Sequence, residues 1–364
     1  MAARVTLKTI AERTGLSVPT VSQILNNRQN NYSSAETREK VLQVAKELHY
    51  RQNFGYQLLH GKKTGTVAMI ASGGNFYNEQ KRRMFQASLI GQLTRAGYNA
   101  YSTMFSYDPV SNLDLVRNLL HRGVEQVILH GHPVNVEEII AELTHAEVNF
   151  IGTFGIYPRY VYNGSAQGRK RILEYIISQV GEDFKIINPG KRVSGDAGHI
   201  KPLCWQFPQV PLEKLEERFV VKIAAPENTV NDDWMQGIAQ SRQELYQCGY
   251  QAMEQLHRSG EMPRAVIFSN DTYAVGGGMW LMETGHEKYR ERVILAGYNN
   301  DAELNSFPLP IISGEDDITR QTQMLIERCG DMEPCTETVM PRVFFRKHFA
   351  RNRFPAWDCE VEQL

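Results

Sequence analysis

The chain has 364 residues, 42% of them hydrophobic, and a formal net charge of −1, a combination that excludes a short peptide module and predicts two or three domains with a large core. It contains no apolar run long enough to cross a membrane and no segment typical of a signal peptide, so we expect a cytoplasmic protein without a membrane partner. Its five cysteines form no C-x-x-C pair, and we interpret them as reduced thiols rather than metal ligands.

The charge is distributed unevenly along the chain. Residues 1–63 contain ten lysines and arginines against four acids, a formal charge of +6 that leaves −7 for the remainder. A small basic end on an acidic body suits binding to DNA, because neutralising backbone phosphates releases counterions. The alternative is a solvated run of charges, but these charges flank a predicted pair of helices.

The stretch from Leu7 to Asn26 predicts two short helices joined by a turn at Gly15. Ser17 is the expected cap of the second helix, and Pro19 fits only in its first turn, where a missing N–H costs nothing. On spacing alone, a small helical bundle without a DNA function is the better interpretation. Apolar residues recur at helical spacing on both helices: Leu7, Ile10 and Ala11, then Val18, Val21 and Leu25.

The residue types in this stretch resemble those of the lactose-repressor/galactose-repressor (LacI/GalR) family of bacterial transcription regulators. In that family the pattern A-x-x-x-G-V-S-x-x-T-V-S-x-x-L-N is typical. Thr9 and Leu16 depart from it, since the family usually has an acid and a valine there. The residues that carry the resemblance are Ala11, Gly15, Leu16, Ser17, Thr20, Val21, Ser22, Leu25 and Asn26.

The resemblance implies a helix-turn-helix that binds double-stranded operator DNA through its second helix. Val18, Pro19 and Gln23 are expected to set the operator sequence, Gln23 through an amide that can pair with adenine. A second group of outward residues is expected mainly to hold phosphates: Ser17, Thr20, Ser22 and Asn26.

Residues 1–50 form the predicted headpiece, and residues 51–63 the predicted hinge segment. Ser33 and Glu36 have capping-box spacing at the start of a third headpiece helix. By resemblance, the hinge folds into a helix when two subunits meet on DNA, and Leu59 inserts into the minor groove. Gln52 and Tyr56 replace the proline and the small residue usual in the family, and a flexible linker is the alternative.

From Thr64 onward, short apolar strands alternate with amphipathic helices, which predicts parallel sheets covered on both faces. Strands are expected at 66–72, 98–105, 124–131, 148–154, 184–190, 219–225, 265–271 and 293–300. Helices are expected at 81–96, 113–122, 136–146, 168–180, from near 198, 242–259 and 273–284.

Looser matches to the same family extend over this body, such as Gly249 to Met253 for its G-Y-x-A-M motif. They imply a periplasmic-binding-protein-like α/β body of two doubly wound parallel-sheet lobes at 64–345, which binds the effector and dimerises. Lobe 1 is expected at about 64–160 and 301–340, and lobe 2 at about 161–300 and 341–349. Residues 350–364 form the expected C-terminal tail; the leucine heptads with which family members form tetramers are absent after Phe349, so we expect a homodimer.

Ligands of open α/β sheets bind beyond the carboxyl ends of the strands. By resemblance, Phe76 would pack on an effector ring and Asp271 would accept hydrogen bonds from its hydroxyls. Trp234 resembles another pocket aromatic, with ordinary core packing as an equal alternative. A basic cluster from Lys191 to Lys201 makes an acidic sugar or a sugar phosphate a further possibility beside a neutral sugar.

Enzymatic motifs are missing from the sequence. Gly276-Gly277-Gly278 lacks the G-x-G-x-x-G spacing, and no P-loop, G-x-S-x-G or H-E-x-x-H occurs. His130 and His132 have no carboxylate or thiolate nearby in sequence, so we expect no metal and no cofactor. A solute-binding receptor of the same fold is the main alternative to a regulator, and an α/β enzyme is the second. We expect a repressor whose operator affinity is controlled allosterically by a sugar or sugar derivative.

Overall fold

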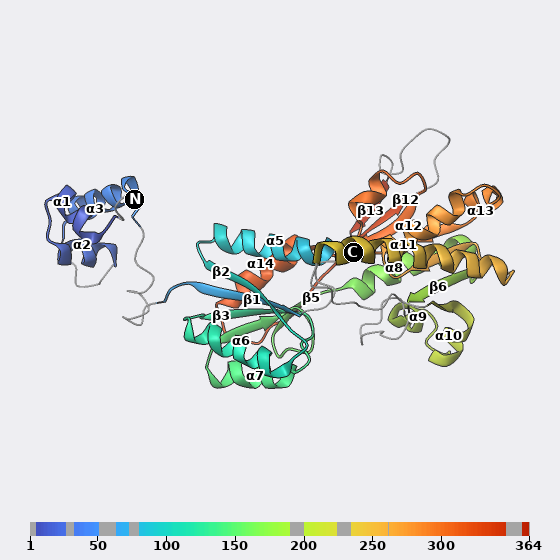
Figure 1. The fold of residues 1–364 in the computed structure, drawn as a ribbon, viewed down its shortest axis with the longest axis horizontal. Helices are drawn as coiled ribbons and strands as arrows, with labels where there is room; N and C mark the ends of the chain where they lie inside the picture. The colour runs from blue at the N-terminus through green and yellow to red at the C-terminus, as the bar shows by residue number, and fades with distance from the viewer. Residues whose placement is uncertain are drawn as a thin grey trace. The chain divides into compact units, whose positions relative to one another are not determined.

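The computed structural model describes residues 5–26, 33–50, 63–72, 80–189, 200–223, 234–260, 262–346 and 359–363 (Figure 1). The chain divides into two compact units, Met1–Thr64 and Gly65–Leu364. No helix in the described ranges is long and apolar enough to cross a membrane.

The first unit is a three-helix headpiece of α1 (Leu7–Thr14), α2 (Val18–Leu25) and α3 (Ala35–Glu47). Gly15 ends α1 in the left-handed conformation, with φ of 74°, which a residue without Cβ adopts at no steric cost. The predicted cap of α3 is wrong by one residue: Ser34, not Ser33, accepts the N–H of Thr37. All three helices contribute to one small buried core, formed by Ile10, Ala11, Val21, Ile24, Val41 and Ala45.

The first sheet of the second unit is entirely parallel and has the order β11-β5-β4-β3-β1-β2. Its strands are β1 (Thr66–Ser72), β2 (Asn99–Phe105), β3 (Gln126–His130), β4 (Asn149–Gly152), β5 (Tyr160–Asn163) and β11 (Thr336–Val339). Alternate residues of β1 pack on opposite faces, as the two-residue period of a strand requires. Val67 and Met69 face α5 (Gln80–Arg95) and α14 (Ile318–Cys329), whereas Ala68 and Ile70 face α6 (Pro109–His121) and α7 (Val136–His145).

The second sheet has the order β13-β12-β10-β9-β8-β6-β7. It is parallel except for β12, which runs antiparallel to both β10 and β13. Its strands are β6 (Phe184–Pro189), β7 (Val220–Ile223), β8 (Ala265–Phe268), β9 (Ile294–Ala296), β10 (Ile311–Glu315), β12 (Arg342–Arg346) and β13 (Cys359–Gln363).

Helices cover both faces of the second sheet. One face packs on α8 (Ser165–Val180), α9 (Ile200–Gln206) and α10 (Leu212–Phe219). The other packs on α11 (Trp234–Arg258), α12 (Asp271–Met282) and α13 (Glu287–Arg290). A short 3-10 helix, η1 (Ala302–Asn305), follows β9. The expected helix-turn-helix headpiece and two-sheet α/β body are therefore both present.

Glycines let α11 and α12 approach with their backbones in direct contact. A Cβ built on Gly249 would lie 2.0 Å from the carbonyl oxygen of Tyr273, and one on Gly276 would lie 2.1 Å from that of Tyr246. The three consecutive glycines at 276–278 are thus buried packing residues inside α12 and not a phosphate-binding loop.

One part of the chain lies in a different sheet from the one expected from the sequence. About 301–340 was expected in lobe 1, but β10 pairs with β9 and β12 in the second sheet. Near the C-terminus, residues 359–363 form β13 on the edge of the second sheet. The sequence patterns had not indicated β5, α10, α13, α14 or any strand after β9.

Candidate functional site

The second helix of the headpiece presents its predicted DNA-reading residues to solvent. Ser17 caps α2 by accepting the N–H of Thr20 at 3.2 Å, and Pro19 lies in the first turn. Val18, Pro19 and Gln23 are exposed, while Val21 and Ile24 on the opposite face are buried in the headpiece core. The exposed face of α2 is therefore accessible to a binding partner, as the predicted DNA contact requires.

The four residues expected to hold phosphates bond to one another on α2. The hydroxyls of Ser17 and Thr20 lie 2.8 Å apart, and the amide of Asn26 donates to the carbonyl oxygen of Ser22 at 2.6 Å and to its hydroxyl at 3.1 Å. A hydroxyl has one donor position, so Ser22, which accepts from Asn26, and whichever of Ser17 and Thr20 accepts from the other can still donate to a phosphate oxygen.

Asp271 is the predicted effector residue whose side chain the structure describes, and it is completely buried. It lies in the first turn of α12, where Ser313 Oγ donates to its two carboxylate oxygens at 2.8 and 2.9 Å and the Asp301 N–H donates at 2.8 Å. Burial, with a smaller contribution from the nearby Asp301, raises the pKa of Asp271 to about 7. In this conformation both carboxylate oxygens of Asp271 accept hydrogen bonds from within the protein.

The other predicted contacts lie largely outside the described residues. Leu59 of the hinge and Phe76 of the effector site both fall there. Trp234 is the first residue of α11, but its side chain is outside the described part of the chain, as are Lys191, Arg192 and His199.

The turn after β9 has an unusual backbone. Asn299 and Asn300 have φ of 114° and 50°, in the left-handed region that side chains seldom adopt. The carbonyl oxygen of the Asn300 side chain accepts a hydrogen bond from Arg346 at 2.7 Å. The backbone N–H of Asn300 donates to Ser313 Oγ at 2.9 Å. Sequence reasoning missed Ser313 and Arg346, because neither belongs to a motif and both strands that carry them were unassigned.

The carboxyl edge of the first sheet carries an aromatic and histidine cluster. His130 stacks on Phe85 of α5 with ring centroids 4.2 Å apart, and His132 lies against Phe154 at 4.6 Å. Burial, and then the nearby Arg82 and Lys81, lower the pKa of His130 to about 3, so the ring is neutral at physiological pH. Thr153 Oγ1 lies 3.0 Å from His130 Nδ1. Among the described side chains, no three potential metal ligands come together.

Three comparisons with known proteins bear on these sites. A family model described as "Bacterial regulatory proteins, lacI family" matches residues 6–53, the whole helix-turn-helix with its capped α2. The headpiece of this chain belongs to the LacI family. The chain therefore carries the DNA-binding module of a bacterial transcription regulator.

Two relatives match longer parts of this chain than the family model does. The sucrose operon repressor of Pediococcus pentosaceus is 30% identical over 134 residues, which are 36% of this chain and 39% of that protein. Catabolite control protein A of Staphylococcus epidermidis is 26% identical over 277 residues, 75% of each chain.

Solved structures match the LacI-family fold over nearly the whole chain. The Lac repressor dimer bound to operator and an anti-inducer aligns with a TM-score of 0.68 at 18% identity, covering 94% of this chain and 98% of that one. The complex of the regulator CelR with cellobiose aligns with a TM-score of 0.57 at 18% identity, covering 94% and 99%. At this identity the likeness establishes the fold alone.

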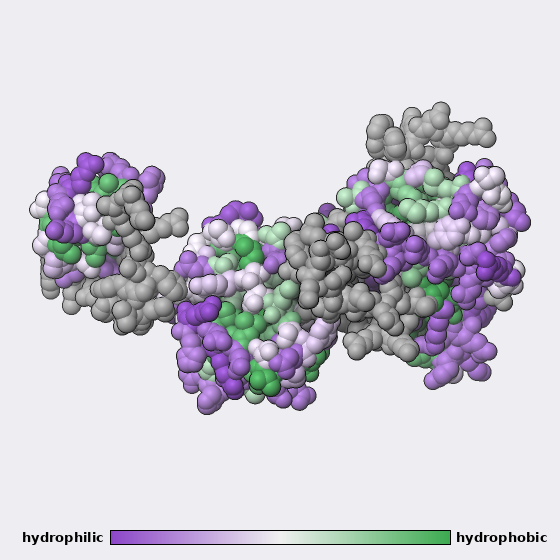
Figure 2. Space-filling model, in the orientation of Figure 1, coloured by the Kyte–Doolittle hydropathy of each residue, from purple (hydrophilic) through white to green (hydrophobic). Residues whose placement is uncertain are grey.

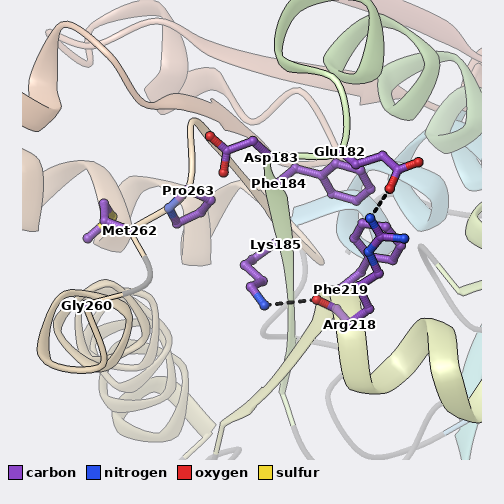
Figure 3. Close-up of a pocket in the computed structure, with 9 residues that line it drawn as sticks. All are labelled: Glu182, Asp183, Phe184, Lys185, Arg218, Phe219, Gly260, Met262 and Pro263. Carbon is purple, nitrogen blue, oxygen red and sulfur yellow. Dashed lines mark hydrogen bonds and ion pairs between the residues drawn. The ribbon is translucent and has the colours of Figure 1, made fainter.

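The regulator also has a surface pocket of about 340 Å³ in the second lobe (Figure 3). It lies beside the amino ends of β6, β7 and β8, opposite the carboxyl edge where ligands of such sheets bind. Its cations have partners within the lobe: Lys185 donates to the carbonyl oxygen of Arg218 at 2.9 Å, and Arg218 pairs with Glu182. We therefore do not place the effector in this pocket.

Proposed function

We propose that the protein is a homodimeric repressor that binds a near-palindromic operator and changes its operator affinity when a sugar or sugar derivative binds between its lobes. The observation that carries the DNA part is the face of α2, where Val18, Pro19 and Gln23 are exposed above a buried core. One such helix spans only a few base pairs, and two related by a twofold axis read a twofold site.

The operator is found by selection from random duplexes with the full-length protein. We expect an enriched near-palindrome with two half-sites separated by about one helical turn, or a multiple of it. Enrichment of a single unpaired site, or of no sequence, would contradict the proposal. Leu59 remains the proposed minor-groove wedge, and a central step that is easily kinked would support it.

A second copy of the chain is the proposed partner of the body. In the described part of the first sheet, β2 is an edge strand, and its Tyr101 is 39% exposed. Met84 on the neighbouring α5 is 47% exposed, and Figure 2 shows hydrophobic residues among hydrophilic ones on this part of the surface. An apolar surface beside a sheet edge favours contact with another protein chain.

The proposed effector is a sugar or sugar derivative, and two observations about similar proteins support this class. One relative is named a sucrose operon repressor, and one protein of the same fold is described with cellobiose bound. In this chain the first turn of α5 carries Arg82 and Arg83 without an acid, near the carboxyl edge of the first sheet, whereas the neighbouring Lys81 pairs with Asp316. Cations at that edge favour an acidic sugar or sugar phosphate among the candidates.

The effector class is tested by a thermal-shift screen of neutral sugars, uronates and sugar phosphates. Binding to the folded state gives about 2.7 kcal/mol at a hundredfold excess over Kd, which is easily detected. For Asp271 to contact the effector, its carboxylate must exchange the hydrogen bond from Ser313 for one from the ligand. If Asp271→Ala leaves the binding of a confirmed effector unchanged, Asp271 is not part of the site.

A further inference from the structure

Asp316 is a completely buried carboxylate at the point where the chain leaves the second sheet, between β10 and α14. Three side chains donate to it. Ser165 Oγ lies 2.9 and 2.8 Å from its two oxygens, the Tyr298 hydroxyl donates at 2.8 Å, and the Lys81 ammonium forms an ion pair with it. Lys81 and Asp316 are 235 positions apart in the chain, and no sequence motif joins them.

The three donors come from different parts of the body. Lys81 is on α5, which packs on the first sheet, whereas Tyr298 follows β9 of the second sheet. Ser165 is the first residue of α8, directly after the chain has crossed from β5. The carboxylate of Asp316 therefore connects α5, which packs on the first sheet (lobe 1), with Tyr298 of the second sheet (lobe 2). Ser165 and Asp316 themselves lie on two segments that cross between the sheets.

Tyr298 is held in place by glycines on two sides. A Cβ on Gly314 would lie 2.3 Å from its ring, and a Cβ on Gly168 would lie 2.8 Å from its hydroxyl oxygen. The guanidinium of Arg169 lies 4.0 Å from the ring centroid and donates to the carbonyl oxygen of Ser269 at 3.0 Å. The absence of side chains at both glycines lets the Tyr298 ring pack directly against α8 and β10.

Asp316 carries its charge in spite of burial. Burial alone opposes ionisation, but Lys81, Ser165 and Tyr298 together hold the pKa of Asp316 below its usual value. The amino end of α8, where Ser165 lies, also favours a negative charge. A buried charge that loses its partner is strongly destabilising, so any movement of α5 relative to Tyr298 must be accommodated at this carboxylate.

We propose that Asp316 is the positioning residue of the regulatory mechanism, the joint that makes Lys81 of lobe 1 and Tyr298 of lobe 2 adopt one relative orientation. The inference rests on the proposed function, in which the angle between the lobes sets operator affinity. When the joint is altered, the preferred angle changes even without an effector. Allosteric coupling requires such an element, with different contacts in each state.

The test compares four full-length variants with the natural protein. Lys81→Met and Asp316→Asn each remove one charge, and the combination Lys81→Met with Asp316→Asn is neutral, so it leaves no unpaired buried charge. Lys170→Met is the matched control, because it removes a partly exposed ion pair with Glu174 on α8 that does not involve Asp316. Thermal midpoint, small-angle X-ray scattering of the free protein and affinity for the selected operator are measured for each.

We expect both single variants to lose thermal stability and the neutral pair to regain most of it. All three should still differ from the natural protein in scattering profile and in operator affinity, the latter by about fivefold or more. Lys170→Met should match the natural protein in every measurement. A role limited to stability predicts instead that the neutral pair recovers operator affinity along with its thermal midpoint.

Two outcomes separate this inference from the proposed function. If the natural protein binds no specific operator, the proposed function fails, and the scattering profiles still test the joint. If operator binding is normal and the neutral pair matches the natural protein in both scattering and affinity, Asp316 is not a positioning residue and the inference is overturned.

Discussion

Gln23 is the exposed amide on α2 that is best suited to hydrogen-bond a base edge. We expect Gln23→Ala to relax the operator preference at one symmetric pair of positions, with a loss of about 1–3 kcal/mol of discrimination there. Competition binding with operators substituted base by base measures this. The matched control is Gln43→Ala, which removes a headpiece glutamine that donates to Glu47 on α3. An equal loss for all sequences would mean that Gln23 contacts the backbone instead.

Asp271 stabilises the folded protein more at low pH than at neutral pH, which is the opposite of what most carboxylates do. Its pKa is about 7 in the folded protein, against an ordinary value of 3.8, so between these values the folded state binds more protons than the unfolded state. The contribution of Asp271 to the free energy of unfolding therefore falls as pH rises from about 4 to about 7. Urea denaturation across this range should show that Asp271→Asn weakens the fall, by an amount of the order of a few kcal/mol.

A control excludes a general effect of removing an acid. Asp331→Asn removes a carboxylate that is partly exposed and pairs with Arg159, so it measures the effect of losing an acid outside the buried Asp271 site. If Asp271→Asn and the natural protein lose stability equally between about pH 4 and about pH 7, the pKa of Asp271 is not raised into this range.

At the scale of the elements, the contact between α11 and α12 depends on the absence of side chains. Gly276→Ala would place its methyl group against the Tyr246 carbonyl, so we expect a loss of about 3 kcal/mol or more. Gly91→Ala in α5 is the opposite case, because its nearest neighbour would be the flexible end of Arg95 at 3.6 Å. There, helix propensity predicts a gain of about 1 kcal/mol. Chemical denaturation of both variants tests the contact, and equal effects would contradict it.

Local signals made the headpiece and the first strands predictable from sequence. The cap at Ser17, the turn at Gly15 and the apolar spacing all lie within one short stretch, and β1 was expected at the residues where it occurs. The later strands were harder, because β10 and β12 belong to a sheet built mostly from earlier parts of the chain. The joint at Asp316 was not predictable, since it exists only when residues as distant as Lys81 meet.

At the scale of the whole molecule, we expect a dimer at micromolar concentration. The headpiece has a small core of six buried side chains, so it offers one small binding surface. Two headpieces held together in a dimer bind one operator more tightly than a single headpiece does. Light scattering of the free protein and of its operator complex measures the stoichiometry. A monomer in solution that also binds DNA as a monomer would contradict the proposed repressor.

The first sheet also constrains the order in which the protein can fold during synthesis. Its edge strand β11 pairs residue by residue with β5. During synthesis, Tyr160–Asn163 can therefore form this pairing only after Thr336–Val339 have left the ribosome. Until then β5 presents an unpaired edge, and an open strand edge is where chains associate wrongly. Lobe 1 begins first and is completed almost last, so β5 is the strand that a chaperone would have most reason to protect.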